Sequence, residues 1–162
     1  MPLATARRCF SGLPRPLAAM VIAAVISACA PLPSPVPVAV PPLAPGQARL
    51  WFYRDFLPGD TMTAPAVAIN AWTVGYAYPG AHFYRDLPAG RYLVTVDTQG
   101  RDVGQSQQLA LVPGEQEYIK IMSLPSWATD FRGRTLPTYY ARAVAPRIAA
   151  AELPLTSYFG GQ

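Results

Sequence analysis

The sequence predicts an all-β domain, an antiparallel β-sandwich of about seven to eight strands with a short C-terminal helix. From Gly46 onward, short runs of alternating apolar and polar residues follow one another, as expected of strands with one buried face. Turns containing Pro and Gly separate these runs at intervals of roughly 10–12 residues, with no helical pattern between them. Such a series favours a sandwich over an α/β fold.

Each run defines one expected strand. The strands are expected at residues 48–54, 66–70, 73–77, 81–85, 91–97, 107–112, 117–122 and 138–144. Asn70-Ala71-Trp72 is a plausible hairpin connection, and Pro113-Gly114 joins the sixth and seventh strands. The interval 124–134 between the last two strands is expected to be a loop.

The C-terminal part of the chain contains the one expected helix. Residues 146–153 fit two helical turns, because Pro146 suits a first turn and Pro154 ends the pattern. Residues 154–162 are expected to form a loose tail, apart from Tyr158 and Phe159.

The N-terminal 28 residues have the features of a secretory signal peptide. They carry three arginines and no acid, followed by an apolar run at 17–26 and the small residues Ser27 and Ala28. The apolar run has ten residues, whereas a membrane-spanning helix needs about 20. A processed signal is therefore favoured over a transmembrane helix.

The motif Ile26-Ser27-Ala28-Cys29 resembles a lipobox, the substrate of the bacterial lipoprotein signal peptidase. The resemblance implies cleavage between Ala28 and Cys29, a thioether-linked diacylglycerol on Cys29 and acylation, such as palmitate, of the new amino terminus. Ordinary cleavage near Ala28 or Ala30 is the alternative. Several acyl chains would hold the protein on a membrane permanently. The residue after the cysteine is Ala30 and not Asp, which resembles the enterobacterial signal for sorting to the outer membrane. The expected location is therefore the cell envelope, anchored in the outer membrane and facing the periplasm.

Two routes of export are compatible with the signal peptide, the general secretory route and the twin-arginine route. Arg7-Arg8-Cys9-Phe10 resembles the core of a twin-arginine signal, but paired arginines are also ordinary in signal peptides. Both cysteines of the chain, Cys9 and Cys29, are removed or lipidated in this scheme, so no disulfide is expected in the mature chain.

The expected organisation has four parts. They are a signal peptide (1–28), a lipidated cysteine with a Pro-rich linker (29–45), a sandwich domain (46–153) and a tail (154–162). The linker has seven prolines in residues 30–45 and is expected to be an extended spacer; a motif for a proline-reading partner is the alternative. The mature chain has ten basic and nine acidic residues, a net charge of +1, which gives no support for nucleic-acid binding.

The domain also resembles a known family. Gln47-Ala48-Arg49-Leu50-Trp51-Phe52-Tyr53-Arg54, Leu87-Pro88-Ala89-Gly90-Arg91-Tyr92 and Pro113-Gly114-Glu115-Gln116-Glu117-Tyr118-Ile119 follow in an order similar to bacterial domain of unknown function 2846. That family occurs mostly in short lipoproteins, and the second stretch also resembles transthyretin-like and carboxypeptidase-regulatory-like sandwiches. The resemblance implies fold and location, and it brings no catalytic residues.

No catalytic or cofactor-binding pattern is found in the sequence. His82 is the one histidine, and nucleophile elbows, zinc-protease motifs and phosphate-binding loops are missing. Asp97 and Asp102 flank one hairpin and are more readily explained as solvated acids than as Ca²⁺ ligands. We therefore expect no enzyme activity, no cofactor and no metal.

One sequence feature occurs twice. Residues 52–59 resemble residues 83–90, and each copy has an Arg-Asp pair before a Pro/Gly turn (Arg54-Asp55 and Arg85-Asp86). A duplicated ligand clamp is the functional interpretation. Solvated charges at the end of a sheet are the favoured one.

Aromatic residues suggest where a partner binds. Trp72, Tyr76, Tyr78, Phe83 and Tyr84 are expected to be core residues. Trp127 and Phe131, beside Arg132 and Arg134, form a candidate partner-binding loop. The expected function is a lipid-anchored binding or scaffolding module for an envelope protein; the alternative is a glycan or peptidoglycan module with exposed rings at Trp127, Tyr139 or Tyr140.

Overall fold

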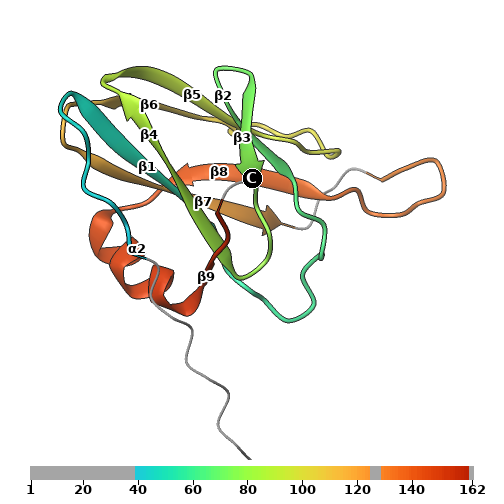
Figure 1. Ribbon diagram of the computed structural model, residues 1–162. Helices are drawn as coiled ribbons and strands as arrows, with labels where there is room; N and C mark the ends of the chain where they lie inside the picture. Colours follow the sequence, from blue (N-terminus) through green and yellow to red (C-terminus); the bar gives the residue numbers. More distant parts are fainter. Residues whose placement is uncertain (1–38, 125–128, 161–162) are drawn as a thin grey trace, which may run out of the picture. The chain divides into compact units, whose positions relative to one another are not determined.

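The computed structural model describes residues 39–124 and 129–160, which form two β-sheets packed face to face (Figure 1). The predicted all-β sandwich with one short C-terminal helix is thereby confirmed. The strands are β1 (Gln47–Arg54), β2 (Ala66–Ile69), β3 (Trp72–Tyr76), β4 (Ala81–Pro88), β5 (Gly90–Val96), β6 (Gln107–Leu111), β7 (Gln116–Leu124), β8 (Thr138–Ala143) and β9 (Ser157–Tyr158). Helix α2 (Pro146–Glu152) and the 3₁₀ turn η2 (Leu153–Leu155) lie between β8 and β9.

The first sheet has the order β8-β7-β1-β4-β9 and the second the order β3-β2-β5-β6. Two pairs, β1 with β7 and β4 with β9, are parallel, so the expectation of wholly antiparallel sheets was wrong for these pairs. For β1 and β7 the cause is a change of sheet. The chain leaves the second sheet after β6, turns at Gly114, and enters the first sheet in the direction of β1.

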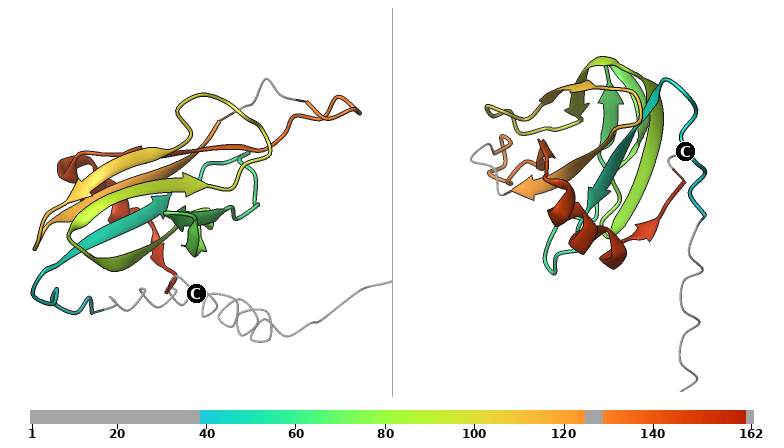
Figure 2. Two further views of the ribbon diagram at one scale, coloured as in Figure 1. Left: turned by 90° about the horizontal axis from the view of Figure 1, so that it is seen from above. Right: turned by 90° about the vertical axis from the view of Figure 1, so that its left-hand side faces the viewer.

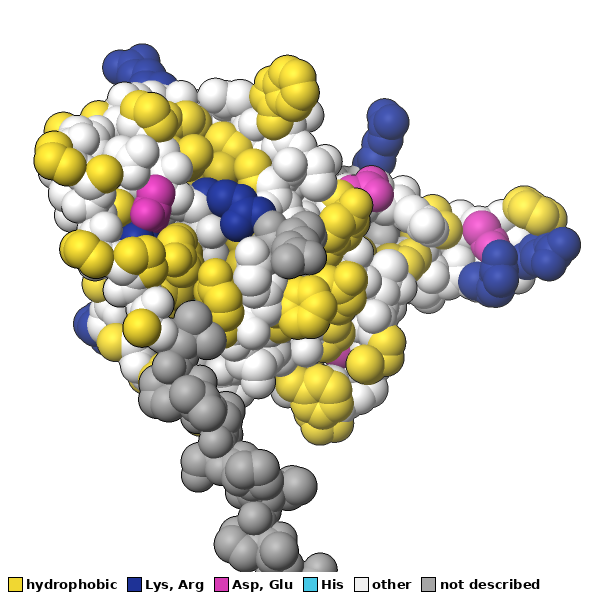
Figure 3. Space-filling model, in the orientation of Figure 1, with side chains coloured by type: hydrophobic (Ala, Val, Ile, Leu, Met, Phe, Trp, Pro, Cys, Tyr) yellow, Lys and Arg dark blue, Asp and Glu magenta, His cyan; other side chains and the backbone are white. Residues whose placement is uncertain are grey.

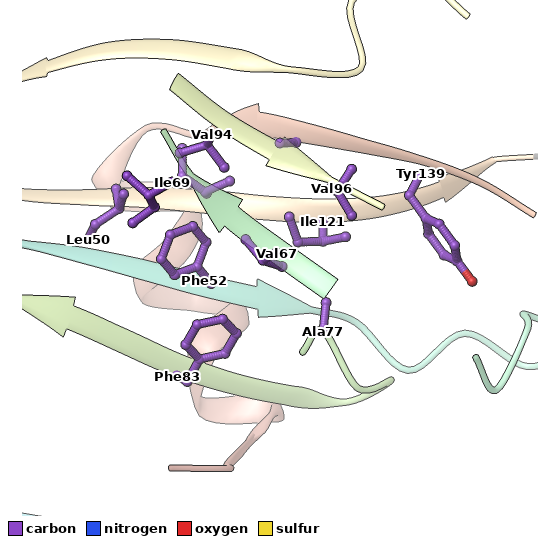
Figure 4. Close-up of a cluster of buried hydrophobic side chains, with 12 residues drawn as sticks. Leu50, Phe52, Val67, Ile69, Ala77, Phe83, Val94, Val96, Ile121 and Tyr139 are labelled. Atoms are coloured by element: carbon purple, nitrogen blue, oxygen red, sulfur yellow. The ribbon is translucent and has the colours of Figure 1, made fainter. Parts of the chain in front are cut away.

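The core lies between the two sheets and consists of alternate residues of their strands (Figure 4). On β1, Leu50 and Phe52 point inward and are fully buried. The ring of Phe52 stacks on Phe83 of β4, with ring centroids 4.9 Å apart. The opposite sheet contributes Val67, Ile69, Val94 and Val96. This alternation is the one that the sequence predicts.

One edge of the first sheet is closed by hydrogen bonds. Along β8, the backbone N–H groups of Tyr139, Ala141 and Ala143 donate to Thr98 Oγ1, the carbonyl oxygen of Gln105 and Gln107 Oε1, at 3.1, 3.0 and 3.3 Å. An edge with satisfied donors is a poor template for another strand. The side of the sandwich at β8 is therefore protected from strand addition.

Helix α2 packs against the outer face of the first sheet and begins at Pro146, as predicted (Figure 2). Glu152, at its end, accepts hydrogen bonds from the Tyr53 hydroxyl at 2.6 Å and from Lys120 Nζ at 2.8 Å. Burial, followed by the bond to Glu152, raises the pKa of Tyr53. Lys120 also pairs with Asp55 at 2.6 Å, so one ionic network connects the helix to β1 and β7.

The tail is held over more residues than Tyr158 and Phe159, the two that were expected to be held. The chain continues from α2 through η2 into β9, where Ser157 and Tyr158 pair with Ala81 and His82 of β4. Backbone N–H groups of Ser157 and Phe159 donate to the carbonyl oxygens of Gly80 and His82. The described part of the tail therefore belongs to the first sheet.

The predicted hairpin between β2 and β3 has a strained turn. Asn70 and Ala71 form its two-residue loop with φ angles of 48° and 71°. Both values suit a type I′ turn, which favours Asn-Gly. Alanine in this left-handed conformation costs about 1–2 kcal/mol relative to a residue without Cβ.

Ala71→Gly is therefore expected to raise the free energy of unfolding by about 0.5–1 kcal/mol, as measured by chemical denaturation. Ala110→Gly, at an exposed position of β6 with ordinary backbone, is the matched control and is expected to lower it. A loss of stability in Ala71→Gly would contradict the assignment of the turn.

Candidate functional site

The candidate site lies at the end of the sandwich where β1 and β7 finish, here called the distal end. It consists of residues 55–65 after β1, the last residues of β7 and residues 129–137 before β8. Because β1 and β7 are parallel, both strands reach this end, whereas the linker enters β1 at the opposite end. The segment before β8 extends beyond the sheets in two views (Figures 1 and 2).

A small hairpin forms the tip of this segment. Thr129 and Thr135 form an antiparallel bridge, and Asp130 fixes the chain between them. Its Oδ1 accepts the backbone N–H groups of Arg132 and Arg134, each at 2.9 Å, and its Oδ2 accepts Arg134 Nε at 2.7 Å. Gly133 has φ of 75°, the left-handed conformation that the turn requires.

This brace presents an aromatic and a cationic side chain to solvent. Phe131 is 91% exposed, and the guanidinium of Arg132 lies 5.2 Å from the centre of its ring. Figure 3 shows hydrophobic and basic side chains at the end of the projecting segment. Of the predicted partner-binding residues, the structure brings Phe131, Arg132 and Arg134 together on one hairpin. Trp127 lies outside the described residues.

The hairpin brace is expected to be sensitive to acid. The hydrogen bond from the backbone N–H of Arg134, followed by the bond from its side chain, lowers the pKa of Asp130. A lowered pKa means that the brace is complete above the ordinary carboxyl pKa of about 3.9 and is lost as pH falls through the lowered value.

We expect amide hydrogen exchange at Arg132 and Arg134 to accelerate in that pH range after correction for intrinsic rates, and to be fast at all pH values in Asp130→Ala. Asp97→Ala removes another exposed acid and is expected to leave both amides protected. Equal protection in wild type and Asp130→Ala would show that Asp130 does not hold the hairpin.

A hollow of about 530 Å³ lies at the foot of the hairpin. Residues 57–61 form one wall and residues 135–138 the other, with Ser123 and Leu124 of β7 between them. A smaller hollow of about 180 Å³ shares Leu57, Asp60, Ser123 and Leu124 with it. The larger volume is in the usual range of binding pockets, about 300–1,000 Å³.

Arg54 lines the smaller hollow and is 1% exposed. Its Nη2 donates to Asp60 Oδ2 at 2.7 Å and to the carbonyl oxygen of Thr61 at 2.8 Å. Its Nη1 donates to the carbonyl oxygens of Thr63 and Ala77 at 2.7 and 3.2 Å. Burial tends to raise the pKa of Asp60, but hydrogen bonds from Arg54, Ser123 and the Thr61 N–H hold it below its usual value. Arg54 therefore fixes the connection 55–65.

A second buried arginine lies toward the linker. Arg49 is 3% exposed and forms a two-pronged ion pair with Asp86, at 2.6 and 2.7 Å. Its Nη2 also donates to the carbonyl oxygen of Pro41 at 2.9 Å, and its guanidinium lies 4.3 Å from the ring centre of Tyr84. Pro41, which was assigned to the spacer, is thereby attached to the domain.

The repeated Arg-Asp pairs do not behave as solvated charges, so the favoured interpretation was wrong. Arg54 and Asp60 are paired beneath the surface, Asp55 binds Lys120, and Asp86 binds Arg49. Arg85 donates to the carbonyl oxygens of Tyr84 and Val74. These residues bind partners within the domain, so they do not form a symmetric clamp for a ligand.

The one histidine connects β4 to the tail. His82 Nδ1 lies 2.7 Å from Thr156 Oγ1, and the Thr156 hydroxyl donates to the carbonyl oxygen of Leu153 at 2.7 Å. Because that hydroxyl proton is already used, His82 carries its proton on Nδ1 in this arrangement. Burial lowers the pKa of His82. The side chain of His82 thus adds one contact to the backbone pairing that holds the tail on β4.

For several aromatic residues, burial in the structure is the reverse of what the sequence predicts. Phe83 is buried as predicted, but Trp72, Tyr76 and Tyr78 are exposed by 80, 44 and 39%. Trp72 follows the hairpin turn directly, and Tyr76 pairs with Ala66, the first residue of β2. Their exposure shows that neither ring is enclosed between the sheets. Conversely, Tyr139 and Tyr140 are buried, so neither ring is the exposed glycan platform that the alternative function needs.

The other candidate residues from the sequence do not form a common site in the described structure. In the described ranges 39–124 and 129–160, no group of three or more His, Cys, Asp or Glu is arranged to hold a metal. Asp102 accepts a hydrogen bond from the Tyr140 hydroxyl at 2.6 Å, and Asp97 is exposed. Ala28 and Cys29 lie outside the described residues. Among the helices that are described, none is long and apolar enough to span a membrane.

Comparison with protein-family models, with curated proteins and with solved structures finds no match for this chain. The resemblance to domain of unknown function 2846 stays a prediction.

Proposed function

We propose that this protein is a lipid-anchored module of the bacterial envelope that binds another envelope protein through its distal end. The proposal is carried by the braced hairpin, on which Phe131 and Arg132 are held out to solvent by Asp130. An exposed phenylalanine costs little conformational entropy to bury, and aromatic residues and arginine are enriched at the centres of protein interfaces. The lipobox-like Ile26-Ser27-Ala28-Cys29 supports anchoring through a lipid on Cys29.

The test is affinity isolation of the cross-linked protein from intact envelopes, with wild type, Cys29→Ser, Phe131→Ala and Val103→Ala compared. Val103 is 85% exposed on a different loop and is the matched control. We expect Cys29→Ser to leave the membrane fraction. One protein partner is expected with wild type and Val103→Ala, and to be reduced at least tenfold by Phe131→Ala, because hot-spot truncations cost about 2 kcal/mol or more.

Three results would overturn the proposal. If Cys29→Ser stayed in the membrane fraction at the wild-type level, a lipid on Cys29 would not be the anchor. Recovery of wall fragments with no protein would favour the glycan-binding alternative, and equal recovery with Phe131→Ala and wild type would remove the hairpin from the interface.

A further inference from the structure

The distal end contains a place where a strand of the first sheet is missing. Strand β7 continues to Leu124, but its last partner on β1 is Tyr53, paired with Lys120. Four residues of β7, 121–124, therefore run past the last pair with β1, and three of them, 122–124, run past Arg54, where β1 ends. On their other side they remain paired with β8, from Ala141 to Thr138.

The direction of the backbone groups follows from the ladder. The N–H of Arg49 donates to the carbonyl oxygen of Glu115, and the N–H of Val144 donates to that of Tyr118. Odd-numbered residues of β7 therefore turn their backbone groups toward β1, and even-numbered residues turn theirs toward β8. By the same alternation, the N–H and C=O of Ser123 point to the side that β1 has left.

These groups open onto the two hollows already described. Both are lined by Ser123 and Leu124, and both are bounded on the other side by Leu57 and Asp60. Within residues 39–124 and 129–160, no backbone group of the 55–65 connection is hydrogen-bonded to Ser123. We call this space, between β7 at 121–124 and the walls at 57–61 and 135–138, the β7 slot.

The walls of the β7 slot restrict what it can hold. Leu57, Leu124 and Leu136 supply apolar surface, while hydroxyl groups come from Thr61, Thr135 and Thr138. The charges are balanced, because the Asp60 carboxylate is paired with Arg54. Such a slot suits an uncharged segment that offers backbone donors and acceptors together with apolar side chains.

We propose that the β7 slot receives a short extended segment of the partner protein, which adds to β7 as a strand through the backbone of Ser123. This rests on the proposed function and names the kind of partner, since the slot lies at the foot of the Phe131 hairpin. An extended peptide added to a free sheet edge gains affinity from backbone hydrogen bonds and specificity from side-chain contacts. The closed edge at β8 offers no such place.

The first test places a photo-reactive phenylalanine analogue at Leu57 or at Leu136 of the full chain in intact envelopes. Val112, 59% exposed near the opposite end of β7, is the control position. We expect both slot positions to cross-link to the same short segment of one protein, and Val112 not to. Cross-links to wall glycan, to a second copy of this chain, or to scattered segments would overturn the proposal.

The second test separates the backbone of Ser123 from its side chain. Ser123→Pro removes the N–H, whereas Ser123→Ala removes only the hydroxyl that bonds Asp60. We expect a synthetic peptide of the cross-linked segment to bind the Ala variant like wild type and the Pro variant roughly three- to tenfold more weakly, the worth of one hydrogen bond. Thermal melting checks that both variants are folded.

A chemical variant of the peptide makes the test independent of mutation. N-methylation of the peptide amide opposite Ser123 is expected to weaken binding by the same factor, and N-methylation of the next amide to leave it unchanged. Equal effects at all positions, or equal binding by the two Ser123 variants, would overturn strand addition. If Phe131→Ala still loses the partner in that case, the hairpin interface stands and the slot alone is excluded.

Discussion

Arg54→Met is expected to lower the free energy of unfolding by about 3–5 kcal/mol. Methionine keeps an unbranched apolar stem but removes the guanidinium. The carboxylate of Asp60 and three carbonyl oxygens, of Thr61, Thr63 and Ala77, then lose their donor beneath the surface. A polar group left unpaired in this way costs more than its hydrogen bond contributes.

Chemical denaturation measures this loss, and Arg101→Met, at an exposed position, is expected to change stability by less than about 0.5 kcal/mol. The double variant Arg54→Met/Asp60→Leu also removes the carboxylate, so it should recover part of the loss. A cost below about 1 kcal/mol for Arg54→Met would show that water replaces the guanidinium.

Phe83→Ala is the second large effect, with an expected loss of about 3–5 kcal/mol. The ring is 2% exposed, stacks on Phe52 and fills the space above Gly75. A Cβ at Gly75 would lie 2.7 Å from two ring carbons, so Gly75→Ala alone is expected to cost about 1–3 kcal/mol through overpacking.

The two changes are expected to be coupled. In Gly75→Ala/Phe83→Ala the new methyl group enters the space vacated by the ring, so the double variant should lose less than the sum of the single losses. Phe159→Ala, at a half-exposed position, is the control and is expected to cost far less than Phe83→Ala. Strict additivity would mean that Gly75 and Phe83 do not share this space.

The sandwich could be predicted from the sequence because alternation is a local signal. Leu50 and Phe52 lie two apart on one buried face, and Asn70 suits the first, left-handed position of the hairpin turn. The parallel pairing of β1 with β7 left no such signal, because it depends on the order in which distant strands enter a sheet.

The charged residues show the limit of local reasoning most clearly. An Arg-Asp pair at the end of a strand is usually solvated, and Arg54-Asp55 fits that pattern in sequence. Arg54 is buried because the irregular connection after β1 folds back and supplies the carbonyl oxygens of Thr61 and Thr63. Ala77, after β3, supplies a third, and no periodicity in the sequence reveals any of them. The gap beside Ser123 likewise follows from the different lengths of two strands that meet only in the folded sheet.

On the proposed lipid anchoring at Cys29, the bond from Arg49 to Pro41 would shorten the free linker between the membrane and the domain. If the spacer ran from Cys29 to Gly46, it would allow a reach of about 50 Å at 3.1 Å per residue, whereas attachment at Pro41 leaves about 37 Å. A shorter linker confines the domain to a smaller volume above the bilayer. The local concentration of the domain near the membrane then rises by about twofold. Partners embedded in the same leaflet would then be met more often than those deep in the wall.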